Sequence, residues 1–288
     1  MKISVSSYSF QQYIAAGKMT QLDCVAKAKE MGFDAIEFID IAGAPDFEAQ
    51  KAYAQQIRAE ADRVGIPINA YTIGASLYQG SAEKDQAEVE RLKKQLEIAK
   101  ILGAKVMRHD CCYKLEKTGK ARSFDLMLPT IAANARAVTE HAETLGIQTC
   151  TENHGYIAQD SDRVERLFNA VAHDNFGLLV DIGNFLCADE NPAIAVSRVA
   201  PYAVHVHAKD MLVRSKPFGQ RSFPTRACNY LMGTVVGEGD VPVEQCLRIL
   251  KQAGYDGYVS IEFEGSGDCL EGIERGLKNL RTYLEAIG

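Results

Sequence analysis

Hydrophobic and polar positions along this chain follow two periods, which take turns from one end to the other. Short runs rich in Ile, Val and aromatic residues indicate strands, and longer stretches with apolar residues every three to four positions indicate amphipathic helices. The predicted strands are Ile3–Ser7, Ala35–Phe38, Ile66–Tyr71, Lys105–Arg108, Ile147–Glu152, Phe176–Asp181, Ala203–Lys209 and Tyr258–Glu262. The predicted helices are Leu22–Met31, Phe47–Val64, Ala82–Leu102, Thr130–Leu145, Asp162–His173, Val243–Ala253 and Cys269–Ala286.

Glycines mark the points where predicted helices give way to the next strand. Gly32, Gly65, Gly103, Gly146 and Gly254 stand where a helix C-cap tolerates a positive φ. Alternating strands and helices predict parallel pairing with right-handed crossovers, and eight such units close a barrel. We therefore expect an α/β fold, a single (β/α)8 TIM barrel over residues 1–288, with the long 210–240 segment lying over its top face.

Composition narrows the class of protein and its partners. No apolar run approaches the roughly 18 residues that a membrane helix needs, and the N-terminus alternates like a strand and lacks a signal-peptide core. Eight scattered cysteines without a C-x-x-C motif fit reduced thiols, so we expect a cytoplasmic protein. The net charge of −6 opposes a nucleic-acid surface. We expect a small-molecule substrate, no membrane partner, and an oligomeric state that the pattern leaves open.

Four consecutive strand ends carry the candidates for chemistry, because the active site of such a barrel forms at the C-terminal ends of its strands. Glu152, Asp181, His207 and Glu262 occupy these ends, and strand alternation directs them inward. Three crowded carboxylates raise one another's pKa values unless a cation neutralises them, which predicts one divalent metal ion. Oxygen-rich ligation with one imidazole favours Mn²⁺ or Mg²⁺, with Co²⁺ as a further option.

Several of these residues also have a structural interpretation. Taken alone, Asp181 is better explained as a helix cap or a lysine partner, and only the coincidence of four strand ends favours the metal site. Glu37 and Arg108 fit pocket lining as well as structural ion pairing. Glu264 fits an orienting partner as well as a ligand. His205, deeper in the barrel, is expected to be a hydrogen-bonded core residue.

Candidates for substrate contacts surround the expected ligands. Lys209, two residues after His207 on the same face, would bind a hydroxyl, carboxylate or phosphate or act as an acid, and its structural alternative is an ion pair. Arginines of the long loop would close over an anionic substrate or remain solvated. The candidates for substrate binding are His154, Asn153, Asn184, Lys209, Arg108, Glu37 and Arg214, with Arg221 and Arg226 beside the last.

The strand-end phrases carry a resemblance to a known family. Glu-Asn-His-Gly, Asp-Ile-Gly-Asn, His-Val-His-Ala-Lys-Asp, Gly-Glu-Gly-Asp-Val-Pro and Ser-Ile-Glu-Phe-Glu-Gly resemble the xylose isomerase-like TIM barrel superfamily, and within it the sugar phosphate isomerase/epimerase group. The resemblance implies that Glu152, Asp181, His207 and Glu262 bind one divalent metal, commonly Mn²⁺, and that the two glutamates also transfer protons. Asn184 stands where ketose 3-epimerases have a substrate-binding histidine, so the resemblance does not define the substrate.

The expected function is a divalent-metal-dependent isomerase or epimerase of a small sugar or polyol-derived carbonyl compound, acting by proton transfer through a metal-stabilised enediolate. Loss of a β-hydroxyl from the same enediolate would make the protein a dehydratase acting on a keto-sugar or inosose, and the sequence leaves this alternative open. Apurinic endonucleases share the barrel but collect more histidines than the six found here. A non-catalytic sugar-binding protein would leave the two glutamates without a purpose.

Overall fold

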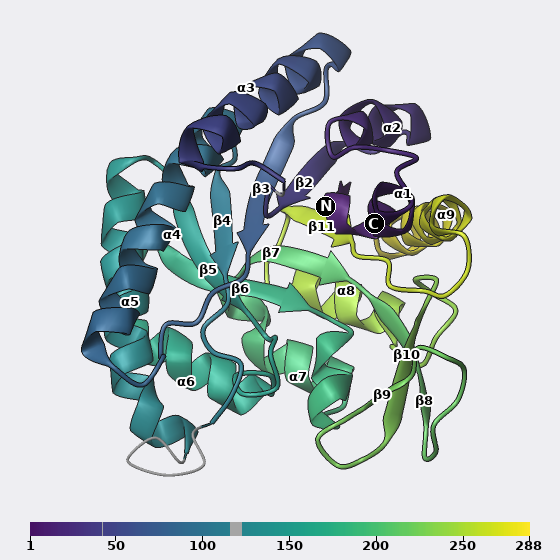
Figure 1. Ribbon diagram of the computed structural model, residues 1–288. Coiled ribbons are helices and arrows are strands. Elements are labelled where there is room, and N and C mark those ends of the chain that lie inside the picture. Colours follow the sequence, from purple (N-terminus) through teal and green to yellow (C-terminus); the bar gives the residue numbers. More distant parts are fainter. Residues whose placement is uncertain (42, 116–122) are drawn as a thin grey trace.

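Eight parallel strands close into a barrel in the computed structural model, which describes residues 1–41, 43–115 and 123–288 (Figure 1). The order around the barrel is β1 (Lys2–Ser6), β11 (Tyr258–Ile261), β7 (Ala203–Ala208), β6 (Phe176–Asp181), β5 (Gln148–Glu152), β4 (Val106–His109), β3 (Ile68–Ile73) and β2 (Ala35–Ile39). Each strand pairs with its neighbours in chain order once the inserted strands β8 to β10 are set aside. The predicted single (β/α)8 TIM barrel is confirmed.

Helices surround the barrel and cover the outer face of its strands (Figure 1). They are α2 (Asp23–Met31), α3 (Phe47–Val64), α4 (Ala82–Leu102), α5 (Phe124–Thr144), α6 (Ser161–Val171), α7 (Pro192–Val199), α8 (Val243–Gln252) and α9 (Cys269–Ile287), with the short α1 (Gln11–Ala15) after β1. The bounds of α3 and α4 are those that the sequence predicts. Gly32, Gly65 and Gly103 are left-handed C-caps, so the glycine stop signals are confirmed at these helices.

The short α1 was not predicted, and α7 and α5 show the largest further differences from the prediction. α7 was missed although Asn191 caps it and Pro192 opens it, because its eight residues are too few for a clear period. α5 starts at Phe124, six residues before the predicted Thr130, and runs through Pro129. Phe124 and Met127 are buried, and their packing holds this first stretch of the helix despite the hydrogen bond that proline cannot donate.

The 210–240 segment, expected as a long loop, contains a three-stranded antiparallel sheet. Its strands are β8 (Asp210–Arg214), β9 (Phe223–Pro224) and β10 (Tyr230–Thr234), in the order β8-β10-β9. Met211 and Leu231 form a small core with Cys187, and Asp210 accepts backbone hydrogen bonds from Gly237, Gly239 and Val241. The segment is therefore an ordered small sheet, not a loop. It lies next to the C-terminal end of β11, where Gly233 of β10 packs against the backbone of Glu264.

The barrel interior is polar, and the main hydrophobic core lies between the strands and the helices. In β2, the side chains of Ile36 and Phe38 join this core, while Glu37 between them turns inward and is fully buried. Buried polar groups are stable only when hydrogen bonds or opposite charges compensate them. A barrel interior lined with charged groups therefore marks a functional site.

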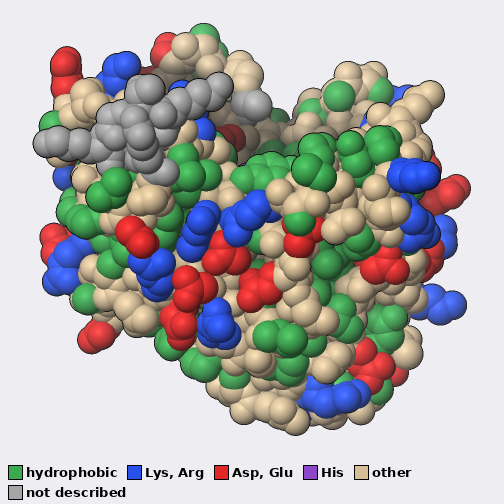
Figure 2. All heavy atoms as spheres, turned by 90° about the horizontal axis from the view of Figure 1, so that it is seen from below, with side chains coloured by type: hydrophobic (Ala, Val, Ile, Leu, Met, Phe, Trp, Pro, Cys, Tyr) green, Lys and Arg blue, Asp and Glu red, His purple; other side chains and the backbone are tan. Residues whose placement is uncertain are grey.

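Further features bear on the environment of the protein. In the residues that the structure describes, no helix combines the length and apolarity needed to cross a membrane. All eight cysteines are free thiols, as the sequence predicted. On the face drawn in Figure 2, acidic and basic side chains are interspersed with hydrophobic ones.

Candidate metal centre and active site

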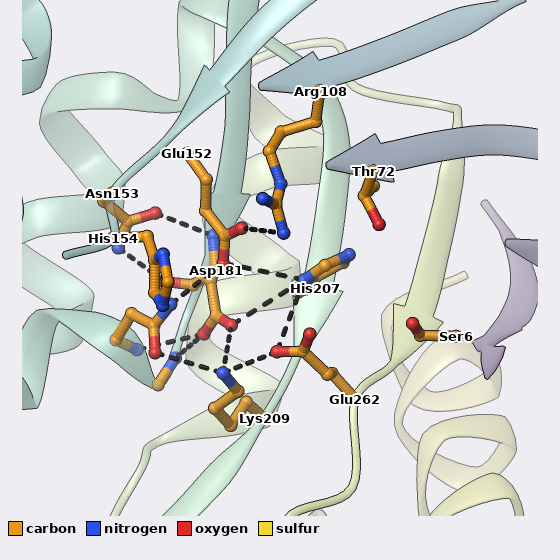
Figure 3. Close-up of polar contacts among 12 residues, drawn as sticks. Ser6, Thr72, Arg108, Glu152, Asn153, His154, Asp181, His207, Lys209 and Glu262 are labelled. Atoms are coloured by element: carbon orange, nitrogen blue, oxygen red, sulfur yellow. Dashed lines mark hydrogen bonds and ion pairs between the residues drawn. The ribbon is translucent and has the colours of Figure 1, made fainter. Parts of the chain in front are cut away.

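Side chains from four consecutive strands of the barrel meet at its C-terminal end (Figure 3). Glu152 ends β5, Asp181 ends β6, His207 lies in β7, and Glu262 directly follows β11. Each residue offers one ligand atom, and these atoms all lie within 4.8 Å of one another. Nδ1 of His207 lies 3.7 Å from Oε1 of Glu152, 3.8 Å from Oδ2 of Asp181 and 3.6 Å from Oε2 of Glu262. The four expected ligands thus surround one point.

Asp181 is oriented by the backbone that follows it. Its Oδ1 accepts hydrogen bonds from the amides of Gly183, at 2.8 Å, and Asn184, at 2.9 Å, which leaves Oδ2 for the cluster. A Cβ at Gly183 would lie 2.7 Å from the carbonyl oxygen of Lys209, so this turn needs glycine. Burial raises the pKa of Asp181 to about 6, and the neighbouring carboxylates add to the rise. The rise comes first from burial and only then from the crowded acids, and the charge of Lys209 opposes it.

Glu152 is held from two sides. Nη2 of Arg108 lies 2.9 Å from its Oε2, and the side-chain amide of Asn184 donates to its Oε1 at 2.9 Å. Burial works to raise the pKa of Glu152, but Arg108 and His207 outweigh it and lower the pKa below its ordinary value. Arg108 and Asn184, predicted to contact substrate, therefore contact an expected metal ligand, and the charge of Arg108 helps to keep that ligand ionised.

Lys209 completes the ring of charges around the cluster. Its Nζ lies 2.5 Å from Oε2 of Glu262, 3.3 Å from Oδ2 of Asp181 and 3.7 Å from Oε2 of Glu264. Burial works to lower the pKa of Lys209, but these carboxylates raise it well above its ordinary value, so the ammonium stays charged. The ion pair that the sequence offered as an alternative is present, and it joins Lys209 to two expected ligands.

Glu37 lies deeper in the barrel, on the other side of His207. Nε2 of His207 is 3.0 Å from its Oε1 and 2.9 Å from its Oε2, and Nε2 of His205 is 2.5 Å from Oε2. Burial works to raise the pKa of Glu37, but His207 and His205 lower it below its usual range. Glu37 is fully buried, so of its two predicted roles the structure favours the structural ion pair. His205 is a hydrogen-bonded core residue, as predicted.

Asp110, which the strand-end pattern did not single out, organises the rim beside Glu152. Nδ1 of His154 lies 3.0 Å from its Oδ1, the hydroxyl of Tyr113 donates to its Oδ2 at 2.5 Å, and Arg108 is within 3.3 Å. Burial works to lower the pKa of His154, but Asp110 raises it to about 9. The His154 side chain is 43% exposed, so solvent reaches it. The signal for Asp110 was available, because this residue directly follows β4.

Asn153 uses both ends of its amide on the backbone of Asp181. Its Nδ2 donates to the Asp181 carbonyl at 2.9 Å, and its Oδ1 accepts from the Asp181 amide at 2.9 Å. The side chain is buried. These two bonds fix the ends of β5 and β6 relative to each other, and the contact of Asn153 with substrate stays a prediction.

The three loop arginines have separate surroundings. Arg214 is 54% exposed and lies 3.6 Å from Asp240, and its contact with substrate stays a prediction. Arg226 pairs with Asp160 at 2.7 Å, at the start of α6. Arg221 lines a cavity of about 280 Å³, together with Tyr8, Gln12, Phe223 and Glu264. Arg221 therefore reaches a cavity that is also lined by Glu264, a neighbour of Lys209.

The residues around the cluster fit a divalent cation. Nδ1 of His207 and Oδ2 of Asp181 are buried and have no hydrogen-bond partner within the described parts of the chain. Negative charge is in excess around the cluster, because among the described residues four carboxylates face only two permanent positive charges, those of Arg108 and Lys209. The carboxylates are those of Glu37, Glu152, Asp181 and Glu262. Carboxylates with one imidazole suit Mn²⁺ or Mg²⁺. Buried ligand atoms that lack a hydrogen bond and converge on a common point are what a metal site provides.

Residues 25–283 match the family model described as the xylose isomerase-like TIM barrel. The chain belongs to this family. Among curated proteins, it is 25% identical over 160 residues to the inosose dehydratase of Lacticaseibacillus casei, covering 54% of this chain and 53% of that protein. The chain therefore spans about half the length of this relative.

Solved structures share the fold over nearly the whole chain. The 3-keto-D-glucoside 4-epimerase of E. coli superimposes with a TM-score of 0.70 and 18% identity, covering 98% of this chain and 99% of that one. A xylose isomerase-like TIM barrel protein from Mycobacterium smegmatis, in complex with magnesium, gives a TM-score of 0.71 and 19% identity, covering 99% and 97%. The relatives include sugar epimerases and inosose dehydratases, and at these identities the solved structures establish the fold alone.

Proposed function

We propose that the protein is a divalent-metal-dependent isomerase or epimerase of a small sugar or polyol-derived carbonyl compound. The observation that carries the proposal is the convergence of Glu152, Asp181, His207 and Glu262 on one point, with Nδ1 of His207 unpartnered. A bound cation, which we propose to be Mn²⁺ with Mg²⁺ or Co²⁺ as substitutes, would polarise the substrate carbonyl and stabilise an enediolate. The substrate is a small molecule rather than a nucleic acid.

The chain's own residues supply the proton transfers. Glu152 and Glu262 come from β5 and from the end of β11, so they reach the common point from different walls of the barrel. One carboxylate would remove the proton next to the carbonyl, and the other would return a proton to the opposite face or to the adjacent carbon. The first outcome is epimerisation and the second is aldose–ketose isomerisation. Both glutamates have lowered pKa values, so either can accept the first proton. The glutamate that returns a proton must first take one up, and the ammonium of Lys209, 2.5 Å from Glu262, would supply it.

Dehydration of a keto-sugar or inosose is the second candidate. It shares the first proton removal, and the similarity to an inosose dehydratase favours it. The reaction additionally needs an acid that protonates the departing hydroxyl. The charged ammonium of Lys209, 2.5 Å from Glu262, is such a donor.

We further propose that the protein is cytoplasmic, which its free cysteines support.

NMR in D₂O tests both candidates. The protein, loaded with Mg²⁺ so that the spectra stay sharp, is mixed with a panel of ketoses, inososes and their phosphates. Deuterium that enters the position next to the carbonyl, in a stereoisomer or isomer of the substrate, supports the first candidate. An unsaturated or dicarbonyl product supports the dehydratase. Wild-type protein that binds Mg²⁺ and gives neither deuterium exchange nor product with any compound would contradict both.

Two variants link the chemistry to the site. Glu152→Gln and Glu262→Gln keep the size of each side chain and remove the carboxylate that accepts the proton. Each should abolish deuterium exchange while leaving the far-UV circular dichroism spectrum unchanged. Glu97→Gln, in α4 outside the barrel, is the matched control and should keep full exchange.

A further inference from the structure

Glu37 and His207 form the best-defined polar contact beneath the candidate metal centre. Both carboxylate oxygens of Glu37 lie within 3.0 Å of Nε2 of His207. His205 adds a third contact through its own Nε2, and the hydroxyl of Thr72 donates to Oε1 at 3.3 Å. The three ionisable side chains are buried, so no water competes for these bonds.

These contacts decide where His207 carries its proton. An ionised carboxylate only accepts hydrogen bonds, so the Nε2 atom of each imidazole that faces Glu37 must donate. A metal ligand must be a neutral imidazole, which has one N–H, so in the metal-bound protein the lone pair of His207 is on Nδ1. Nδ1 is the atom that faces the three carboxylates at 3.6 to 3.8 Å and has no hydrogen-bond partner within the described parts of the chain.

We propose that Glu37 is a positioning residue, which locks His207 in the tautomer that directs its Nδ1 lone pair at the metal. The inference rests on the proposed function, because it assumes that the cluster binds a cation. It gives a fully buried acid of β2, 170 residues away from His207 in the chain, a specific task. A carboxylate that accepts the second N–H of a metal-bound histidine fixes the ring and makes the ligand more basic.

His205 has a supporting task in the same contact. Its Nε2 lies 2.5 Å from Oε2 of Glu37, and its ring meets that of His207 edge-on, with centroids 5.5 Å apart. The second hydrogen bond holds the carboxylate in place between the two rings. Glu37, His205 and His207 also form a group with the composition of a second metal site. In the structure, the Nε2 atoms of His205 and His207 both contact the Glu37 carboxylate. We therefore assign to this group two N–H donors shared with one carboxylate, and no metal ion.

Mn²⁺ binding to the protein tests the proposal. Electron paramagnetic resonance of free Mn²⁺ gives the dissociation constant and the stoichiometry without any need for substrate. Glu37→Gln keeps the volume but can donate to Nε2, which favours the wrong tautomer, so its dissociation constant should rise about 10- to 100-fold. Glu37→Asp keeps the charge and should recover part of the affinity. Asp85→Asn, a buried acid in α4 outside the barrel, is the matched control and should bind like the wild type.

The tautomer itself is measurable on the wild type, so the proposal does not depend on whether Glu37→Gln folds. In ¹⁵N NMR of the protein loaded with diamagnetic Zn²⁺, His207 should show a protonated Nε2 and a metal-shifted Nδ1. A protonated Nδ1, an affinity of Glu37→Gln within twofold of the wild type, or two Mn²⁺ ions per chain would each overturn the assignment. Failure of the wild type to bind any Mn²⁺ would instead contradict the proposed function itself.

Discussion

The ammonium of Lys209 lies 2.5 Å from Oε2 of Glu262, inside a cluster of carboxylates. The same nitrogen is 3.3 Å from Asp181, so one lysine neutralises two of the four expected metal ligands. Opposite charges at this distance in a buried site interact strongly, and neither charge tolerates the loss of its partner. The same contact therefore affects both the stability of this end of the barrel and the proposed metal binding.

Removal of this lysine should make the stability of the folded protein depend more strongly on bound metal. Lys209→Met leaves Glu262 and Asp181 without their counter-ion, which should cost about 3 kcal/mol of unfolding free energy in metal-free buffer. Mn²⁺ should restore more stability to this variant than it adds to the wild type, because the competing ammonium is gone. Thermal unfolding with and without Mn²⁺ measures both effects. Equal metal-free stability of the two proteins would mean that the ion pair contributes nothing.

Metal binding should stabilise the wild type through Asp181. A cation that binds only the folded state, at 100 times its dissociation constant, adds about 2.7 kcal/mol to the unfolding free energy. Asp181→Asn loses the ligand oxygen that has no other hydrogen-bond partner in the described structure, so its melting temperature should not respond to Mn²⁺ or to EDTA. Differential scanning calorimetry across a Mn²⁺ series tests this, and a full response of Asp181→Asn would remove this residue from the ligand set.

The pair of His154 and Asp110 should give the protein a pH-dependent stability term. The folded-state pKa of His154 is raised to about 9, above the ordinary 6.5, by Asp110. Its contribution is therefore fully present below pH 6.5 and disappears as the pH rises through about 9. Urea unfolding from pH 6 to 10 should show a fall for the wild type that Asp110→Asn lacks. The NMR titration midpoint of His154 should fall in that variant. An unchanged midpoint would mean that Asp110 does not raise the pKa of His154.

The turn after β6 should tolerate no side chain. A Cβ at Gly183 would lie 2.7 Å from the carbonyl oxygen of Lys209, which is backbone and cannot move aside cheaply. Gly183→Ala should lower the unfolding free energy by about 1 to 3 kcal/mol. It should also weaken Mn²⁺ binding, because the amides of this turn orient the Asp181 carboxylate. Gly267→Ala, where a Cβ meets nothing within 4 Å, is the control. Chemical denaturation of both variants decides whether the close approach is required.

The sequence by itself determined the barrel and the candidate ligands. Strand alternation and strand ends are local features, so they are enough to place Glu152, Asp181, His207 and Glu262 on inward positions of consecutive strands. Glycine at the helix ends, such as Gly103, is equally local, because a positive φ excludes most other residues.

Only the tertiary structure decided what each polar side chain contacts. Glu37 meets His207 across 170 residues, and Asp110 meets His154 across 44, so no local pattern reveals either partner. Arg226 and Arg221 stand five residues apart, yet one pairs with α6 and the other lines a cavity. Hydrogen bonds and ion pairs act over a few ångströms, and in a closed barrel those distances are set by strands that are remote in the chain.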